Sequence, residues 1–254
     1  MLKETYDVEK EKWNALAEKK EANLEKFLLK PGEDFYSFCR KSATHIGVEE
    51  FLGDLSDKHV LEYGCGLGQM TSLLAKNSAK VTSFDLSINS IRVTKKRAEL
   101  NEVEENIELA VSAGESLPFA SESFDIIFGK AILHHLNVDL GWHDLYRMLK
   151  PGGKAVFIEP MGMNPLLNFS RDHLPYAHKN PRGADIPLTY DDINAWGKGF
   201  KQFQYREVQL LSMLERGLGR RIRMLPLRKI DAFLLRRFPF LRKYCRYVVI
   251  YLVK

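Results

Sequence analysis

The 254-residue sequence lacks several features that would assign it to a particular class of protein. Its three cysteines, Cys39, Cys65 and Cys245, are far apart and odd in number, which argues against a disulfide framework or a zinc site. No uninterrupted apolar run approaches the roughly 20 residues of a membrane-spanning helix. The first residues, Met1 to Thr5, show no signal-peptide pattern. We therefore expect a cytoplasmic protein in a reducing compartment.

Acidic residues are scarce at one end of the chain, although the net charge is only +5. Residues 216–254 contain 12 Lys or Arg and a single acid, Asp231, so the rest of the chain sums to −6. The hydrophobic content of 45% is ordinary and predicts a sizeable core. A basic end on an acidic body bears on binding partners rather than on fold.

Strand and helix patterns alternate along the middle of the chain. Five strands are expected, at Val60–Leu61, Lys80–Asp85, Ile107–Val111, Ser123–Lys130 and Lys154–Glu159. Helical segments separate most of them, and Lys150–Gly153 is a turn by composition. This alternation predicts an α/β fold with a mostly parallel, doubly wound sheet.

A glycine-rich turn lies between the first strand and the first helix of this region. Glu62 is followed by Gly64, Gly66 and Gly68, an E-x-G-x-G-x-G pattern that brings bare backbone N–H groups close to a ligand. A dinucleotide fingerprint would need glycine at position 69, where Gln69 stands. An acid before the loop would repel a pyrophosphate but suits a cationic ligand.

Three further blocks follow the glycine loop in order. They are Asp85 at the end of the second strand, Glu115-Ser116-Leu117-Pro118-Phe119 with Phe124-Asp125, and Leu149-Lys150-Pro151-Gly152-Gly153. With the loop, they resemble class I S-adenosylmethionine-dependent methyltransferases of the small-molecule, ubiquinone-biosynthesis-like group. The resemblance implies S-adenosylmethionine as cofactor and a Rossmann-like sheet of seven strands, with Lys201–Leu211 and Tyr244–Val253 as the last two.

The resemblance also implies roles for individual residues of this chain. Those expected around the methionine moiety are Glu62, Gly64, Cys65, Gly66, Gly68 and Lys130. Asp85 would accept hydrogen bonds from the ribose hydroxyls. Leu86, Gly114 and Glu115 are expected on the adenine side, whereas Ala113 stands where the family often has an adenine-binding acid.

The adjacent pair His134-His135 follows the fourth strand, at the edge where such folds bind ligands. An acceptor hydroxyl must lose a proton during methyl transfer, and histidine is suited to accept it. The pair resembles that of some sugar O-methyltransferases, in which an acid at the end of the fifth strand assists, here Glu159. The alternative is that one histidine only packs or holds a loop.

Two flanking regions complete the expected organisation. Residues 1–54 are predicted to form helices, with one or two over residues 3–29 and another over Phe35–Leu52. They would either cap the site, with Tyr6, Trp13, Phe35 and Tyr36 as lid aromatics, or simply pack on the methyltransferase domain at 55–254. A basic helical insertion is expected at 213–243, before the last strand.

The expected acceptor is a small molecule, such as a hydroxyl of a sugar, a polysaccharide precursor or a lipid-like metabolite. C-methylation of a quinone or other lipid, or cofactor binding without turnover, are alternatives. The basic segment 216–243 would lie on an anionic membrane surface, making the protein peripheral, or bind an anionic, lipid-linked acceptor. It is otherwise an ordinary amphipathic helix. A nucleic-acid partner is not expected, because no RNA-binding module is visible.

Overall fold

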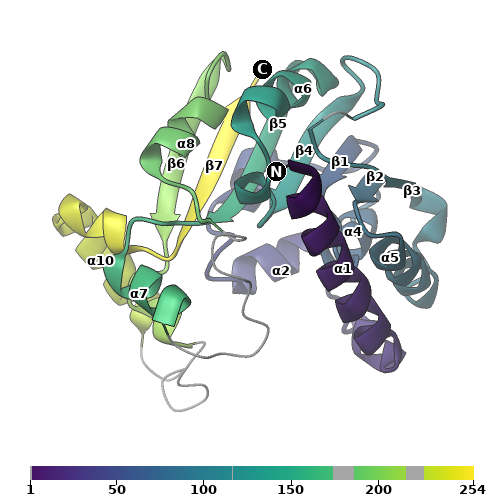
Figure 1. Cartoon of the computed structure of the whole chain (residues 1–254), viewed down its shortest axis with the longest axis horizontal. Coiled ribbons are helices and arrows are strands. Elements are labelled where there is room, and N and C mark those ends of the chain that lie inside the picture. Colours follow the sequence, from purple (N-terminus) through teal and green to yellow (C-terminus); the bar gives the residue numbers. More distant parts are fainter. Residues whose placement is uncertain (1, 116, 174–185, 216–225) are drawn as a thin grey trace.

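The computed structural model describes residues 2–115, 117–173, 186–215 and 226–254 (Figure 1). One seven-stranded sheet runs through it, in the order β3-β2-β1-β4-β5-β7-β6. Its strands are β1 (His59–Tyr63), β2 (Lys80–Asp85), β3 (Ile107–Val111), β4 (Phe124–Lys130), β5 (Leu149–Pro160), β6 (Gln202–Val208) and β7 (Tyr247–Val253). Only β7 runs antiparallel to its neighbours, which confirms the predicted mostly parallel, Rossmann-like sheet.

Helices cover both faces of this sheet. One face carries α2 (Phe35–Lys41), α3 (Val48–Leu52), α4 (Gln69–Ala75) and α5 (Ile88–Leu100), and the other carries α6 (Val138–Met148), α8 (Tyr190–Trp196) and α10 (Leu227–Arg237). The remaining elements are α1 (Leu2–Glu21), α7 (Pro165–His173) and the 3-10 turns η1 (Leu24–Phe27), η2 (Glu104–Asn106), η3 (Leu133–His135), η4 (Ser212–Leu214) and η6 (Pro239–Tyr244).

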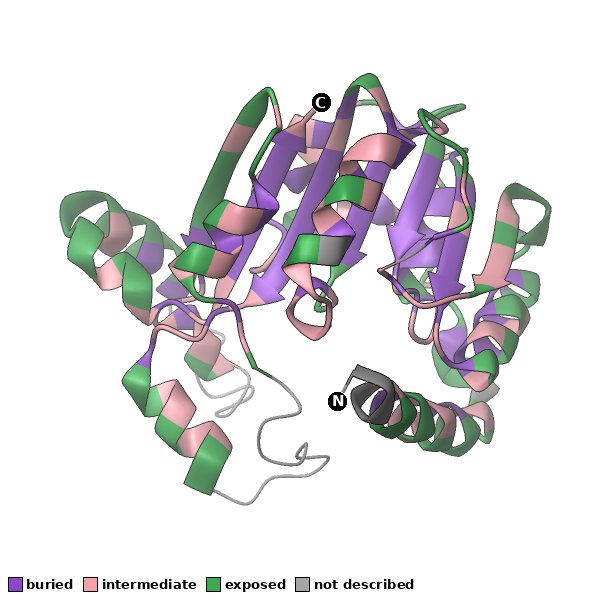
Figure 2. Ribbon diagram, turned by 45° about the horizontal axis from the view of Figure 1, so that its top comes forward, coloured by how far each residue is buried: buried purple, intermediate pink, exposed green. Residues whose placement is uncertain are grey.

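Alternating side chains of the central strands build the two halves of the core. In β4, Ile126 and Phe128 pack toward α2 and α4, while Ile127 between them packs toward α6 and α8. Apolar residues of β7 alternate in the same way. Figure 2 shows these strands as the buried centre of the molecule. Strands buried on both faces read as continuous apolar runs, which is why they were recognisable in the sequence.

The first helix, α1, docks across the carboxyl edge of the sheet by way of α5. Asn14 accepts a hydrogen bond from the Ser87 hydroxyl at 2.6 Å, and Glu18 accepts one from the Asn89 amide at 2.9 Å. Glu21 pairs with Lys96 one turn further along. This polar row fixes one side of α1 and turns its opposite side, with Trp13, toward the glycine loop.

The predicted single helix over Phe35–Leu52 is wrong, because two short helices occupy that stretch. Between them, the Ser42 hydroxyl hydrogen-bonds to the Thr44 hydroxyl at 3.0 Å and to His45 Nδ1 at 2.7 Å. Such local bonds compete with helical backbone bonds. Gly47 then takes a left-handed conformation, with φ 79°, at the start of α3. Phe35 itself is fully buried against Phe128, so it is a core residue and no lid.

The turn predicted at Lys150–Gly153 lies inside β5 rather than before it. Phe124 pairs with Leu149 and Ile126 with Lys154, so the four residues between bulge out of the ladder. Gly152, with φ 75°, provides the bend. Within the described ranges, no helix is long and apolar enough to cross a membrane.

Replacing Asn101 should loosen the N-terminal segment from the rest of the fold. Its buried side chain accepts from the Leu29 backbone N–H at 2.8 Å and donates to the Phe27 and Arg97 carbonyls. Asn101→Ala leaves buried backbone groups unpaired, so we expect a loss of about 1–3 kcal/mol in unfolding free energy. Urea denaturation followed by circular dichroism measures it. The exposed Asn106→Ala should change stability by less than about 0.5 kcal/mol; equal effects would contradict this account.

Candidate active site

The glycine loop connects the end of β1 to α4 in a conformation that needs glycine. Gly64, Gly66 and Gly68 all have positive φ, at 78°, 52° and 73°. A Cβ on Gly64 would lie 2.9 Å from the Ile132 side chain, and one on Gly66 would lie 3.4 Å from the Trp13 ring. Backbone of the loop is therefore enclosed between α1 and the segment after β4.

Asp85 ties the end of β2 to this loop. Its Oδ2 accepts the Gly66 backbone N–H at 2.9 Å, and its Oδ1 accepts that of Ser87 at 2.9 Å. Burial raises the pKa of this carboxyl to about 6, against the lowering effect of those two N–H groups. A carboxylate accepts about four hydrogen bonds. With the backbone N–H of Leu86 as a third donor, about one acceptor position remains for a hydroxyl group.

Glu62 lies beneath the loop and is almost completely buried, with 3% of its surface exposed. Its carboxyl accepts hydrogen bonds from Thr71 and, at 2.9 Å, from Ser83. Burial raises the pKa of Glu62 to about 8, against the lowering effect of the Thr71 and Ser83 hydroxyls. A cation bound in the adjacent cavity would lower this pKa again.

A cavity of about 670 Å³ lies between the glycine loop and α1. Its volume is within the range typical of small-molecule sites. The sequence-predicted residues on its wall are Glu62, Gly64, Cys65, Gly66, Asp85 and Lys130. Trp13, Leu16 and Lys20 of α1 form the opposite wall, so α1 is a cap over the loop.

A smaller cavity of about 70 Å³ adjoins the first and shares Trp13, Gly64 and Asp85 with it. Leu86 and Gly114, two of the residues predicted on the adenine side, line it. Further wall residues are Tyr6, Glu9, Phe84, Ser112, Ala113, Ile132, His135 and Leu136. The two cavities together form one elongated site along the carboxyl edge of the sheet.

Two of the sequence-predicted cofactor residues lie off the cavity walls. Gly68 starts α4 and faces α5, where a Cβ would lie 2.7 Å from the Thr94 side chain. Glu115 accepts the Asn137 backbone N–H at 3.4 Å and a hydrogen bond from Tyr6, whose pKa burial and this bond raise. Both residues therefore contact elements that lie behind the cavity walls and do not line the cavities themselves.

Glu159 and His134 form a buried pair at the end of β5. Their Oε2 and Nδ1 atoms are 2.6 Å apart, and the two side chains are 0% and 3% exposed. Glu159 Oε1 also accepts the backbone N–H groups of Ile132 and Leu133, at 2.9 and 3.0 Å. The pair therefore holds the sharp turn after β4, where Ala131 has φ 55°.

His135 stands apart from its neighbour because it reaches the walls of both cavities. Its ring lies against that of His134, with centroids 4.0 Å apart. On its other side, Nδ1 is 3.9 Å from a carboxylate oxygen of Glu9, a buried residue of α1. Of the two histidines, His135 is the one placed to meet a molecule in the site.

Sequence reasoning missed the polar residues that complete the site. Arg97 donates to the Leu67 carbonyl at 2.8 Å and to that of Phe27 at 3.3 Å, which joins loop and cap. Glu9, Trp13 and Lys20 are spaced so that they share one side of a helix. This spacing could have been used in the sequence to place all three on the same face of α1. In the described part of the chain, no group of His, Cys, Asp or Glu is placed to hold a metal ion.

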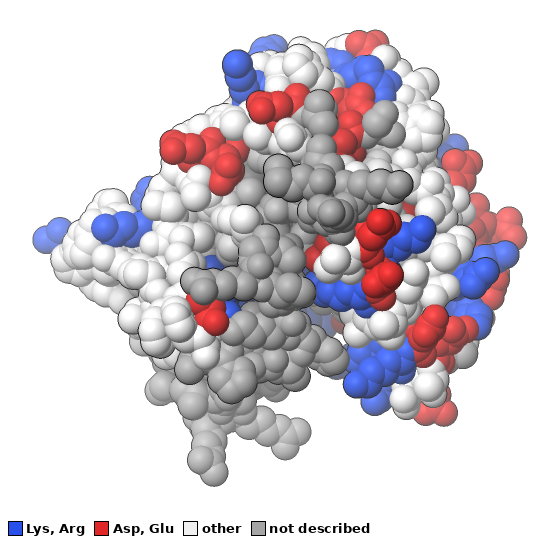
Figure 3. Space-filling view, viewed as in Figure 1, with Lys and Arg blue, Asp and Glu red and all other residues white. Residues whose placement is uncertain are grey.

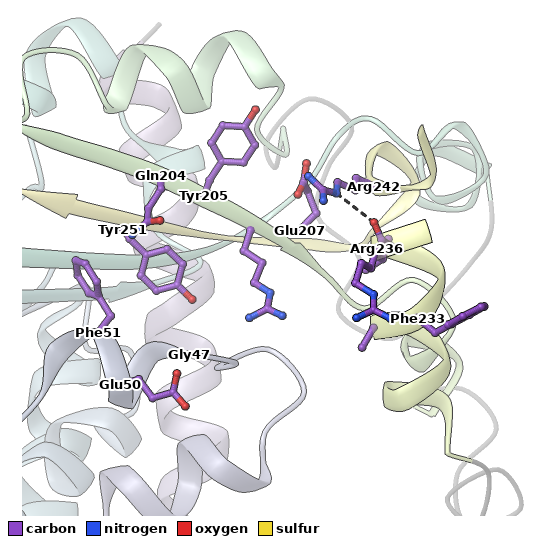
Figure 4. A pocket seen from close by; sticks show the side chains of 13 residues that line it. Gly47, Glu50, Phe51, Gln204, Tyr205, Glu207, Phe233, Arg236, Arg242 and Tyr251 are labelled. Atoms are coloured by element: carbon purple, nitrogen blue, oxygen red, sulfur yellow. Dashed lines mark hydrogen bonds between the residues drawn. The ribbon is translucent and has the colours of Figure 1, made fainter. Parts of the chain in front are cut away.

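A separate open groove of about 1010 Å³ lies between α3, β6 and α10 (Figure 4). Arg236 and Arg242 lie at one end of it, and Tyr251 and Glu50 lie at the other. None of the glycine-loop residues lines this groove. The groove is therefore separate from the elongated site.

Comparison with known proteins identifies the class of this domain. Residues 61–157 match a family described as "Methyltransferase domain". Demethylmenaquinone methyltransferase of Chlorobaculum parvum is 33% identical over 143 residues, 55% of this chain and 56% of that protein. The chain thus covers little more than half the length of that relative. Over residues 61–157 the chain is therefore similar to a methyltransferase domain.

Solved structures share the fold at low sequence identity. Phosphoethanolamine N-methyltransferase 2 of Haemonchus contortus, in complex with S-adenosyl-L-methionine, has a TM-score of 0.57 at 19% identity, over 82% of this chain and 51% of that one. The [4+2]-cyclase SpnF has a TM-score of 0.54 at 19% identity, over 82% and 78%. The predicted fold is confirmed, while the likeness to a cyclase shows that fold alone does not define the reaction.

Cofactor affinity should depend on the ionisation of Asp85. The carboxylate form accepts hydroxyl hydrogen bonds, and it is lost as the pH falls through the pKa of about 6. We expect the Kd for S-adenosylhomocysteine to rise toward tenfold per pH unit as the pH falls below 6. Titration calorimetry across this range measures it. Asp85→Asn should bind weakly at every pH, and a pH-independent wild type would contradict the role.

Proposed function

We propose that the protein transfers a methyl group to a small molecule that carries an ionisable hydroxyl, with His135 as the general base. The observation that carries this proposal is the position of His135 on the walls of both cavities, beside the glycine loop. Expected acceptors are a sugar, a polysaccharide precursor or a lipid-like metabolite.

The residues of the site fit the proposed cofactor. The open backbone at Gly64 and Gly66 admits a ligand where any Cβ would crowd Ile132 or Trp13. Asp85 retains an acceptor position for a ribose hydroxyl, and a nearby cation favours the carboxylate form of Glu62. When bound, S-adenosylmethionine supplies an electrophilic methyl group on a positively charged sulfur. Trp13 on α1 shields the site from water.

His135 would accept the proton that the acceptor hydroxyl loses. A deprotonated oxygen attacks more strongly, and a positioned base contributes typically about 10²–10⁴-fold to rate. Glu159 and His134 support this role indirectly, because they fix the turn that presents His135. Glu9 of the cap lies on the other side of the ring and favours its protonated form as the proton arrives.

A second candidate acceptor is a quinol, favoured by the likeness to Demethylmenaquinone methyltransferase. Deprotonation of a phenolic hydroxyl spreads negative charge onto the adjacent ring carbon, so the same base serves C-methylation. The methylated atom then depends on which atom of the acceptor is aligned with the methyl group. Proton and carbon NMR of the product separates an O-methyl from a C-methyl group.

A different class of function is cofactor binding without methyl transfer. The structural likeness to the [4+2]-cyclase SpnF is the observation that favours this class. Incubation with methyl-labelled cofactor and fractionated cell extract distinguishes the two, because only a methyltransferase releases labelled product. Mass spectrometry of that product also identifies the acceptor.

His135→Ala should lower kcat by about 10²–10⁴-fold and leave cofactor affinity within about twofold, because the imidazole acts on the acceptor. Steady-state kinetics with the identified acceptor, and calorimetry for the cofactor, provide the two readouts.

The variant His134→Ala is the matched comparison for His135→Ala. It should also lower protein stability, because it leaves Glu159 buried without this partner. Unchanged kcat in His135→Ala would rule out the base.

A further inference from the structure

The outer side of α10 and the following η6 turn expose an unusual number of large apolar side chains. Phe233 and Phe240 are 58% and 66% exposed, and Ile230 and Phe238 are each 37% exposed. Phe233 borders the groove between α3, β6 and α10 (Figure 4) and is still largely exposed to solvent. Soluble surfaces seldom gather exposed aromatic rings without a partner to cover them. We call this surface the α10–η6 face; its residues are Lys229, Ile230, Phe233, Arg237, Phe238, Phe240 and Lys243.

The helix pattern separates this face from the side of α10 that packs on the protein. Leu227, Asp231 and Leu234 are spaced for one side of the helix, and the first two are buried. Lys229, Phe233 and Arg237 are spaced four residues apart, so they form a stripe on the opposite side. The face is therefore amphipathic in the sense of an interfacial helix, with cations beside apolar rings.

The acid within α10 does not neutralise this charge. Asp231 is 5% exposed, and its carboxylate accepts backbone N–H groups of Leu210, Leu211 and Ser212, at 2.7–3.1 Å, as well as the Ser212 hydroxyl. It is thus used to fix α10 to the end of β6. Figure 3 shows Lys and Arg side chains among uncharged ones where α10 projects from the molecule.

The α10–η6 face adjoins the carboxyl edge of the sheet. Tyr247, at the start of β7 just after η6, pairs with Pro160 at the end of β5 and with Val208 at the end of β6. The Asn164 side chain, just before α7, donates to the Tyr244 carbonyl at 2.7 Å. The exposed Leu166 of α7, at 77%, therefore extends the apolar surface next to η6. The elongated cofactor site opens along the same edge.

We propose that the α10–η6 face, with Leu166 of α7, docks the protein on the surface of a bilayer that contains anionic phospholipid. The cations complement negative headgroups, and the phenylalanine rings enter the interface between headgroups and acyl chains. Aliphatic side chains at Ile230 and Leu166 suit acyl chains rather than stacked bases, which favours a lipid surface over nucleic acid. The docking is peripheral, and it does not depend on the reaction at the site.

The experiment measures cosedimentation of the full chain with vesicles of phosphatidylcholine alone or mixed with phosphatidylglycerol. Binding to the mixed vesicles should exceed binding to neutral ones and should weaken as salt is added. The variant Lys229→Glu with Arg237→Glu should lower the partition coefficient at least about tenfold. Phe233→Ser with Phe240→Ser should lower it without changing the salt dependence. All four side chains are exposed, so circular dichroism should report native folding.

A matched control reverses the same number of charges at the opposite edge of the sheet. Lys198→Glu with Lys201→Glu, at the start of β6, should bind the mixed vesicles as wild type does, apart from the small effect of net charge. If both charge variants lost the same amount of vesicle binding, net charge alone would explain the binding, and the proposal would be overturned. So would salt-independent binding to neutral vesicles. An RNA oligonucleotide that displaces the protein from vesicles at physiological salt would assign the face to nucleic acid instead.

Discussion

The site depends first on the buried carboxylate of Glu159. It accepts two backbone N–H groups from the turn after β4 and pairs with the His134 ring, with no part of it in contact with solvent. A buried carboxylate is stable only when donors satisfy it. Because the turn supplies those donors, its path out of β4 is fixed. That path places Ile132 against the glycine loop and His135 at the cavity walls.

The opposite wall depends on a second set of polar contacts, which belong to the N-terminal helix. Asn14, Glu18 and Glu21 hold α1 on α5, while Arg97 links the Phe27 carbonyl to the loop residue Leu67. These polar contacts are joined by a small apolar cluster in which Ala17 of α1 packs with Phe27 and Val93.

The sequence predicted most of the sheet, because its central strands β1, β4, β5 and β7 are mostly buried apolar runs, whereas the edge strands β3 and β6 are more exposed. The glycine loop and Asp85 were equally readable, since their geometry is local. The docking of α1 was not, because Asn14 and Ser87 are 73 positions apart and their pairing follows from the final packing. The different surroundings of His134 and His135 also required the three-dimensional turn. Residues 216–225 of the predicted basic insertion lie outside the described structure.

The elongated site is proposed to bind S-adenosylmethionine or its demethylated product and no dinucleotide. Titration calorimetry of the full chain with S-adenosylhomocysteine, and separately with NAD, tests this proposal most directly. The account predicts saturable binding of one S-adenosylhomocysteine per chain, which Gly64→Val abolishes by crowding Ile132, and no measurable heat with NAD. Saturable binding of NAD without any binding of S-adenosylhomocysteine would contradict it.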